Sequence, residues 1–556
     1  MRTTRLLAGV SGLILIVSES HASVRAASKA LSIGPPLVWD AIRKSGYALG
    51  IVGLFLLNAC GGGGGSQCDT CGNAAAGPVK STVSGTVVDK NGLPLAGVTI
   101  SAYYHNAHTT VTTTTDSNGT YSIAGLDSTN TSTDKPDYEI YAEKSGFGFY
   151  PSISDAAGTI SKFDFDGIYR TVIRFISPPG RTVTGNNFTA YRAGEKVASL
   201  PRTGQTLSYA NGDDASAQKG VIWPGTRFLD NSNGTVSDQL TGLVWLKNAS
   251  CFGPSDWATA LAAANGLASG SCGLSDGSTT GQWRMPNANE LESLIDVSRT
   301  NPAVSSGHPF TNINLAKAYW TSTTYMALTA NAMAIRLSDG RWINGIDNGD
   351  GGFNNNKTTS ANLLWAVKSG AAGTVRILAT GVFFSGAGGG GGASFGARDD
   401  ASLQTGAPLT SPRFIDNGNG TIADTVTGLT WLKKANCINN TWPSALSSIN
   451  NLANGQCGLS DGSSAGQWRM PNRNEMLSLS DRAPTFPQAD YFNGQPVGSN
   501  GTVTGPVIFA SFVPFDYYWT STTSAADSNQ AWTVWSCDFG IYNIAKSDKR
   551  YSLAVR

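Results

Sequence analysis

Apolar and polar residues alternate along the first part of the chain that looks folded. The alternation runs from Val83 to Asp89, stops at the turn signal Lys90-Asn91-Gly92, and resumes from Val98 to Ala102. A period of two is typical of strands with one buried face, and the Asn-Gly pair favours a tight turn between them. Similar short strands follow about every ten residues. We therefore predict an all-β sandwich over residues 80–195.

The pattern changes to a helical period in the second half of the chain. Apolar residues stand at i, i+3, i+4 and i+7 at two separate places, and each set predicts one short amphipathic helix. The sets are Trp257, Ala260, Leu261, Ala264 and Trp442, Ala445, Leu446, Ile449. A second helix is predicted after each, because Asn287 with Glu290 and Asn472 with Glu475 have the spacing of an N-cap with its N3 partner.

These features recur because the chain contains an internal repeat with a period of about 186 residues. Three ordered segments match: Arg227 to Thr235 with Arg413 to Thr421, Gly281 to Asn287 with Gly466 to Asn472, and Tyr319 to Thr323 with Tyr518 to Thr522. A unit of this length is a domain, so we predict two homologous α+β domains, at residues 201–370 and 397–556. The Gly-rich residues 371–396 form the linker, and each unit is expected to end in a short strand, Trp365 to Lys368 and Leu553 to Arg556.

Residues 1–60 have the character of a targeting segment. Arg43-Lys44 precedes an apolar run too short to span a bilayer, and the run ends in Leu57-Asn58-Ala59-Cys60. This order resembles a bacterial lipoprotein signal peptide, and the resemblance implies that Cys60 carries the lipid. A buried core segment is the alternative. We hypothesise that translation starts near Val38, so that residues 1–37 are not part of the protein.

The chain would then be held at the membrane by the lipid on Cys60 and followed by a Gly-rich tether, residues 61–79. The expected location is the cell envelope, as an outer-membrane lipoprotein or at the cell surface. No later apolar run is long enough to span a bilayer.

Eight cysteines are present, and four of them occupy matching places in the two repeats. In an oxidising compartment Cys251 and Cys272 predict one disulfide, and Cys437 and Cys457 predict another, each contributing roughly 3 kcal/mol. Zinc is the alternative ligand, but no histidine or second cysteine pair lies near them in the sequence. Cys537 is expected to be a buried thiol, and the Cys68/Cys71 pair lies in the tether.

Charge and histidine content narrow the function classes. The net charge is +1, which gives no field for nucleic acid or an anionic membrane surface. The second repeat contains none of the 4 histidines, so a Ser-His or Cys-His mechanism shared by both repeats is excluded. We assign no catalytic residue, no metal site and no cofactor.

The acids that match between repeats each have a structural explanation. They are Asp230/Asp416, Asp238/Asp424, Asp276/Asp461, Glu290/Glu475 and Asp296/Asp481. Glu290 is expected to cap a helix and Asp230 to shape a turn. The Asp230 loop lacks the bidentate Glu of a calcium loop, since Thr241 stands eleven residues on. The shared tryptophans (Trp245, Trp257, Trp283, Trp320 and their partners) are expected in the core, with sugar stacking as the alternative.

Two family resemblances rest on these motifs. The string SGTVVDKNGLPLAGVTI with TDSNGTYSIAGL resembles the carboxypeptidase regulatory-like (prealbumin-like) domain. The ordered signature RF-DN-NGT, TGL-WLK, two cysteines, WRMPN-NE and YWTST resembles the Lcl C-terminal domain family, named after the Legionella collagen-like protein. That resemblance implies a C-type-lectin-like fold and adhesion, although this chain has no collagen-like repeat and no cationic excess for sulfated glycans.

The sequence therefore predicts a multidomain protein, an all-β sandwich followed by two α+β C-type-lectin-like domains. We expect a lipid-anchored envelope protein that is not an enzyme and that binds an extracellular polysaccharide or protein ligand, with two linked heads raising avidity. The alternatives are an enzyme related to the sulfatase-activating fold, favoured by convergent carboxylates of raised pKa in a cleft, and a purely structural envelope protein.

Overall fold

The protein is described by a computed structural model of residues 80–104, 107–127, 138–153, 158–163, 169–175, 182–192, 196–343, 355–382, 398–482, 492 and 508–556. The signal region, Cys60, the tether with Cys68 and Cys71, and residues 383–396 of the predicted linker lie outside this range. No helix within these ranges has the length and apolar character needed to cross a membrane.

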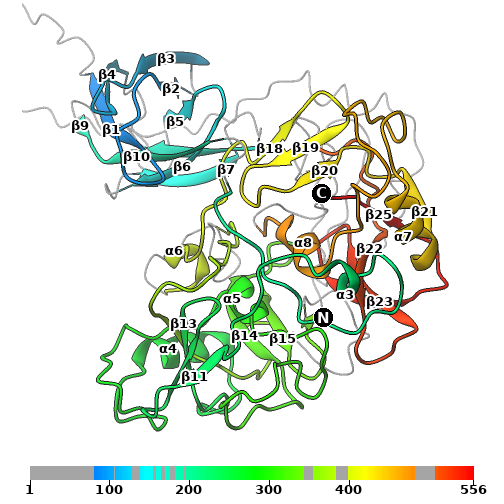
Figure 1. The fold of residues 1–556 in the computed structure, drawn as a ribbon. Coiled ribbons are helices and arrows are strands. Elements are labelled where there is room, and N and C mark those ends of the chain that lie inside the picture. Colours follow the sequence, from blue (N-terminus) through cyan, green and yellow to red (C-terminus); the bar gives the residue numbers. More distant parts are fainter. Residues whose placement is uncertain are drawn as a thin grey trace, which may run out of the picture. The chain divides into compact units, whose positions relative to one another are not determined.

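The first domain is a sandwich of two sheets, as the alternating pattern predicted (Figure 1). One sheet has the order β4-β1-β10-β6 with β9 beside β1, and the other has the order β3-β2-β5-β8-β7. The strands are β1 (Ser81–Asp89), β2 (Thr99–Tyr104), β3 (Thr109–Thr114), β4 (Thr120–Leu126), β5 (Tyr138–Glu143), β6 (Phe147–Ile153), β7 (Gly158–Phe163), β8 (Tyr169–Phe175), β9 (Thr182–Val183) and β10 (Asn186–Arg192). Val83, Val87 and Ile100 are fully buried between the sheets, so the alternating residues form this core.

Head 1 (residues 227–369) is the body of the first repeat. Its elements are β11 (Phe228–Asp230), β12 (Thr235–Asp238), β13 (Leu243–Leu246), α4 (Trp257–Gly266), α5 (Ala288–Glu292), β14 (Tyr319–Thr324), β15 (Ala332–Arg336), β16 (Arg341–Ile343) and β17 (Val367–Ser369). The sheets have the orders β11-β12-β13-β17 and β14-β15-β16. The apolar stripe of α4 is buried as its spacing predicted.

Head 2 (residues 413–556) is the body of the second repeat. Its elements are β18 (Phe414–Asp416), β19 (Thr421–Asp424), β20 (Thr430–Leu432), β21 (Ile438–Asn440), α7 (Trp442–Asn450), α8 (Arg473–Ser478), β22 (Tyr517–Thr523), β23 (Gln530–Trp535), β24 (Ile541–Ala545) and β25 (Arg550–Ser552). The prediction of a regular strand from Leu553 to Arg556 is wrong. Only isolated bridges form there, from Val555 to Trp431 and Arg469, because β25 ends at Ser552.

The Asn-Gly turn at the start of each head requires its glycine. Gly234 has a φ of 83°, and a Cβ there would lie 2.3 Å from the carbonyl oxygen of Gly273. Gly420 repeats this relationship with Gly458, also at 2.3 Å. A side chain at either position would be strained by the positive φ and would collide with backbone, so the turn is specified locally.

The two heads share one hydrophobic core. A single cluster of buried residues contains Trp245, Leu291 and Trp365 of head 1 together with Trp431 and Met476 of head 2. The buried surface is therefore continuous between the two predicted domains. The pair is one folded body.

Candidate functional site

Each head is preceded by a segment whose short helix packs against the other head. Strap 1 (residues 199–220) contains α3 (Asp214–Ala217), and strap 2 (residues 375–407) contains α6 (Asp400–Leu403). Both helices begin in the sequence Asp-Asp-Ala-Ser, with the first Asp as N-cap. In space, α3 lies against β22 of head 2, and α6 lies against β14 of head 1 (Figure 1).

Strap 1 is clamped to head 2 by a buried carboxylate. One oxygen of Asp214 accepts hydrogen bonds from the hydroxyls of Thr203, at 2.6 Å, and Thr522, at 2.7 Å. Gln205 adds two bonds to the Thr523 backbone, donating to its carbonyl at 2.9 Å and accepting from its N–H at 3.1 Å. Residues about 300 positions upstream therefore complete the packing of head 2.

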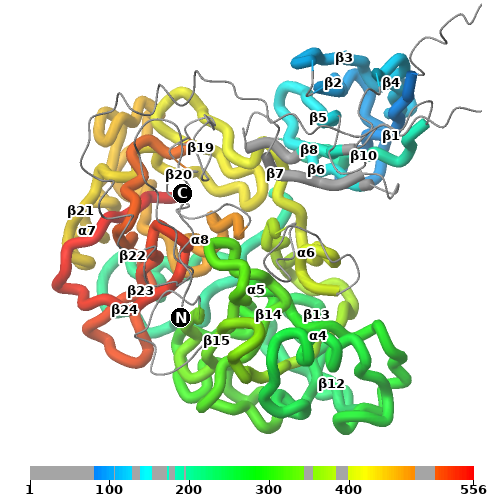
Figure 2. Tube along the Cα trace, turned by 180° about the vertical axis from the view of Figure 1, so that it is seen from behind, coloured from blue at the N-terminus to red at the C-terminus, as the bar shows by residue number. Residues whose placement is uncertain are grey.

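Strap 2 is clamped to head 1 in the same way, and Figure 2 shows α6 close to α5 and β14. One oxygen of Asp400 accepts hydrogen bonds from the hydroxyls of Thr323, at 2.7 Å, and Thr380, at 2.5 Å. Thr323 and Thr522 are the matching residues of the YWTST motif. The clamp is thus duplicated, with each Asp-Thr pair joining a strap to a head.

Burial shifts the titration of both clamp carboxyls. It raises the pKa of Asp214 to about 6, and the two threonine hydroxyls counteract it. It raises the pKa of Asp400 to about 7, again against two hydroxyl hydrogen bonds, with the charge of Glu290 adding to the rise. Raised carboxyl pKa values occur at catalytic sites as well as structural ones. Here Asp214 and Asp400 are only 3% and 2% exposed, so neither faces a cleft.

A matched lysine lies near each clamp. Lys357 and Lys546 each donate to a threonine hydroxyl at 2.8 Å, those of Thr324 and Thr523. Their ammonium groups lie over the rings of Trp257, at 4.4 Å, and Trp442, at 4.0 Å. Burial lowers the pKa of both lysines to about 8. Each therefore fastens the first helix of a head to the strand beside it, as a cation over an aromatic face.

The acids that match between repeats are mostly held in ion pairs or caps. The pairs are Arg227–Asp238 and Arg413–Asp424, Lys247–Asp230 and Lys433–Asp416, Arg284–Glu290 and Arg469–Glu475, and Lys368–Asp276 and Arg556–Asp461. Glu290 and Glu475 also complete capping boxes with Asn287 and Asn472, as predicted. Asp230 accepts from the Ser232 N–H at 3.0 Å, which confirms its role in the turn.

The remaining predicted residues lie in the interior. Both predicted disulfides are present, Cys251–Cys272 and Cys437–Cys457. Cys537 is buried and belongs to neither of them. The shared tryptophans are at most 5% exposed in both repeats, which confirms them as core residues and leaves no exposed face for sugar stacking. Within the described ranges, no three His, Cys, Asp or Glu side chains come together as a metal site.

A second link between the heads is an ion pair at the end of α5. Arg473 of head 2 is paired with Glu292 of head 1 and donates to the Gly340 carbonyl at 2.9 Å. The Arg473 side chain is fully buried and lies 4.8 Å from the Trp532 ring centroid. Burial raises the pKa of Glu292, and the charge of Arg473 counteracts the rise.

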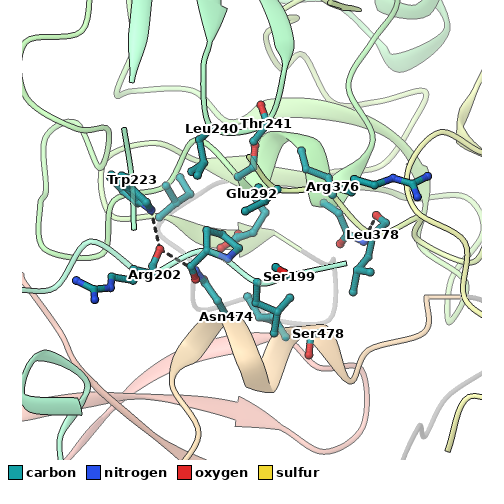
Figure 3. A pocket seen from close by; sticks show the side chains of 18 of the residues that line it. Ser199, Arg202, Trp223, Leu240, Thr241, Glu292, Arg376, Leu378, Asn474 and Ser478 are labelled. Atoms are coloured by element: carbon teal, nitrogen blue, oxygen red, sulfur yellow. Dashed lines mark hydrogen bonds between the residues drawn. The ribbon is translucent and has the colours of Figure 1, made fainter. Parts of the chain in front are cut away.

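A pocket opens beside this ion pair, between the first residues of the two straps and the helices α5 and α8 (Figure 3). Its volume is about 90 Å³. Trp223, Leu240 and Leu378 supply apolar walls, and Asn289 and Asn474 are matched residues of the two helices. Each of these asparagines donates to a strap carbonyl: Asn289 to Leu378 at 3.0 Å and Asn474 to Pro201 at 3.1 Å.

The clamp residues Asp213, Asp214, Asp399 and Asp400, and the pocket itself, were missed by the reasoning from sequence. The signal was present, because Asp-Asp-Ala-Ser recurs at the same period as the other motifs. What the sequence could not show is that a strap crosses to the other head, since matching positions predict similar local structure but not which copy a segment joins.

A β-sandwich followed by duplicated, disulfide-bonded domains is an architecture that suggests an extracellular or surface protein. Family models match both the sandwich and the two repeats. The Lcl C-terminal domain matches residues 234–368 and 420–556, and the carboxypeptidase regulatory-like domain matches residues 82–148. The chain therefore carries two Lcl C-terminal domains behind a carboxypeptidase regulatory-like domain, as its motifs predicted.

Similarity to solved structures is slight. The major pilin subunit BcpA of Bacillus cereus is 16% identical over 21% of this chain and 31% of its own, with a TM-score of 0.14. The dioxygenase domain of a dioxygenase carbohydrate-binding protein fusion from Streptomyces sp. SirexAA-E is 16% identical over 21% of this chain and 82% of its own, with a TM-score of 0.14. This chain thus spans less than a third of the pilin, and scores this low carry no argument. No curated protein matches the chain.

Proposed function

We propose that the chain is a lipid-anchored protein of the cell envelope, at the outer membrane or cell surface. Its paired Lcl domains, of C-type-lectin-like fold, bind an extracellular polysaccharide or protein ligand and catalyse no reaction. The sequence Leu57-Asn58-Ala59-Cys60 supports the anchor, and the domain content supports a surface location.

One observation supports a binding role over a catalytic one: the charged residues that the repeats share are paired with each other and hold the fold together. Four matched acid–base pairs bond to each other inside each head, and the two raised-pKa carboxyls are buried under threonine hydroxyls. A general acid or base must reach the atom it protonates or deprotonates. Most of these groups are buried, and the partly exposed Asp230 and Asp416 are each paired with a lysine. The pocket beside Asn289 and Asn474 contains apolar walls and hydrogen-bonding groups, the usual composition of a binding site.

Two heads that share a hydrophobic core do not act as independently tethered binding modules. Because they share a core, the avidity expected from a flexible pair is replaced by one composite binding body. The binding test therefore uses residues 61–556 with both repeats, since the second repeat alone lacks strap 1.

The experiment is an array of extracellular polysaccharides and matrix proteins probed with the lipid-free chain. A specific ligand bound with sub-millimolar Kd is expected, equivalent to more than about 4 kcal/mol of binding free energy. The absence of any such ligand would count against binding and in favour of a purely structural envelope role.

One observation favours an enzyme as the second candidate. Burial raises the pKa of Asp400 to about 7, near the value suited to a general acid or base at neutral pH. Because its side chain is only 2% exposed, this candidate also requires strap 2 to move so that a substrate reaches the carboxyl. A turnover activity that Asp400→Asn abolishes while the protein stays folded would establish this candidate instead.

A further inference from the structure

The pocket between the straps contains polar atoms that the protein leaves without partners. Ser480 lines the pocket and is 6% exposed, and its hydroxyl has no hydrogen-bond partner among the described residues. Glu292 also lines the pocket, and its second carboxylate oxygen likewise has no hydrogen-bond partner among the described residues. The Trp342 indole lies near enough to lower the pKa of Glu292, but no bond of normal geometry reaches that oxygen. Buried polar atoms of this kind normally have a partner, so these two groups are available to hydrogen-bond a molecule in the pocket.

The repeats differ at the positions that supply these atoms. Glu292 in head 1 matches Leu477 in head 2, and Ser480 in head 2 matches Ile295 in head 1. All four residues line the pocket, so each matched position offers one polar and one apolar side chain. Glu292 also forms the ion pair with Arg473 that links the heads, so its difference from Leu477 has a structural role as well. The hydroxyl of Ser480 bonds to no described group, so its difference from Ile295 has no such role. The pocket is therefore specialised relative to the duplicated frame around it.

The charges around the pocket indicate the kind of ligand. The charges of Arg473 and Arg482 both act on the Glu292 carboxylate, so no net negative charge remains to attract a cation. At short range the carboxylate oxygens still disfavour an anion. The side chains of Arg202 and Arg376 also belong to the lining, but they extend away from its centre on opposite sides (Figure 3). A neutral ligand is favoured.

The walls and the volume define it further. Trp223 presents an aromatic ring held by an indole N–H to the Arg202 carbonyl at 2.8 Å, and Leu240 and Leu378 complete an apolar surface. One water centre needs about 10–15 Å³, so about 90 Å³ holds several waters or one ring-sized group. An acceptor, a hydroxyl and an apolar wall together match a ring that carries hydroxyls on its edge and C–H groups on its face.

We propose that the pocket formed by Trp223, Glu292 and Ser480 binds a neutral, hydroxylated ring, as a single sugar residue of a larger ligand provides. The carboxylate of Glu292 accepts from one ring hydroxyl, Ser480 bonds a second, and the apolar wall covers the ring. This deepens the binding role proposed above and rests on it.

The test is saturation-transfer NMR on the lipid-free chain, residues 61–556. The probes are methyl α-glucopyranoside and methyl β-galactopyranoside, with inorganic sulfate and tetramethylammonium as charged competitors. We expect transfer to at least one neutral glycoside and no displacement by either ion. Ser480→Ile introduces the residue of the matched position in head 1, and we expect it to weaken binding about tenfold or more, as loss of a buried hydrogen bond to a ligand does.

Glu292→Gln is the second variant, because it keeps the shape and removes the charge, and it should also weaken binding. Ser547→Ile, at an exposed position of head 2, is the matched control and should bind as the wild type does. Equal binding by Ser480→Ile and the wild type, no transfer to either glycoside, or displacement by sulfate would each overturn the pocket assignment. An array ligand that Ser480→Ile still binds would leave the proposed function standing and remove only this pocket.

Discussion

The carboxylate of Asp214 accepts a hydrogen bond of 2.7 Å from the hydroxyl of Thr522, a residue 308 positions further along the chain. The matching bond, from Thr323 to Asp400, spans 77 positions. The two contacts are local copies of one clamp, but they connect each strap to a different head. The repeats are therefore interlocked.

Protonation of the clamp carboxyls stabilises the fold. Because burial raises the pKa of Asp400 to about 7, from an ordinary value near 4, ionising this group costs folding free energy. Its contribution is complete below pH about 4 and is lost as the pH rises through about 7. We expect Asp400→Asn, which keeps an acceptor for Thr323 and Thr380, to become more stable relative to the wild type over this pH range, by up to a few kcal/mol.

Denaturant unfolding of both proteins at several pH values measures that difference, and the comparison removes the opposite slope that ion-paired carboxyls contribute. Asp214→Asn should show the same trend ending about one pH unit lower, since burial raises its pKa only to about 6. A stability difference that does not change with pH would contradict the assignment of a buried, neutral clamp.

The second repeat alone should fold incompletely. A chain of residues 397–556 lacks Gln205 and Asp214, so the hydroxyl of Thr522 and the backbone of Thr523 lose their partners. Fusing residues 199–220 to this chain through a flexible linker should restore a cooperative thermal transition. The matched control is the same fusion carrying Asp214→Leu. Equal melting curves with and without strap 1 would show that the clamp contributes nothing.

The ion pair between the heads should depend on both partners. Arg473→Met leaves the Glu292 carboxylate buried without its cation, and such a loss costs about 3–5 kcal/mol. Adding Glu292→Leu, which places the residue of position 477 at its match, should recover most of that loss. A double-mutant cycle in urea measures the coupling, and purely additive effects would mean that the two side chains do not interact.

The two disulfides should contribute equally. Their cysteines are 21 and 20 positions apart in the sequence, so the two closed loops are of nearly equal length. In the chain-entropy account each disulfide should add about 3 kcal/mol to the unfolding free energy. Replacing Cys251 and Cys272 by Ala should lower the unfolding free energy as much as replacing Cys437 and Cys457. A much smaller loss in one repeat would show that the shared core compensates there.

Sequence patterns were enough for the local structure. The alternation around Val83 gave strands of the sandwich, the spacing of Trp257 with Leu261 gave the first helix of a head, and Asn287 with Glu290 gave the start of the second. These features depend on periodicity and capping, which act over a few residues. The disulfides could be predicted because the cysteines occupy matching positions in the two repeats and an oxidising compartment was expected.

The composite site could not be predicted in the same way. The pocket joins Trp223, Glu292 and Ser480, which lie in three segments far apart in sequence. Duplication added an ambiguity, because a segment such as Asp213-Asp214 fits the surface of either copy equally well by pattern. Which copy it joins depends on chain length and on the shared core, and neither leaves a signature in local sequence.

Crossed straps also determine when the molecule can finish folding during synthesis. Head 1 lacks its clamp until the chain has been made past Asp400, and head 2 must then find a segment made some 300 residues earlier. Contacts of such long range slow folding, since the loop must close before the contacts form. Head 1 stays incomplete in any product that lacks strap 2, and head 2 in any product that lacks strap 1. A truncated product would therefore expose its unfinished surface and be prone to aggregation.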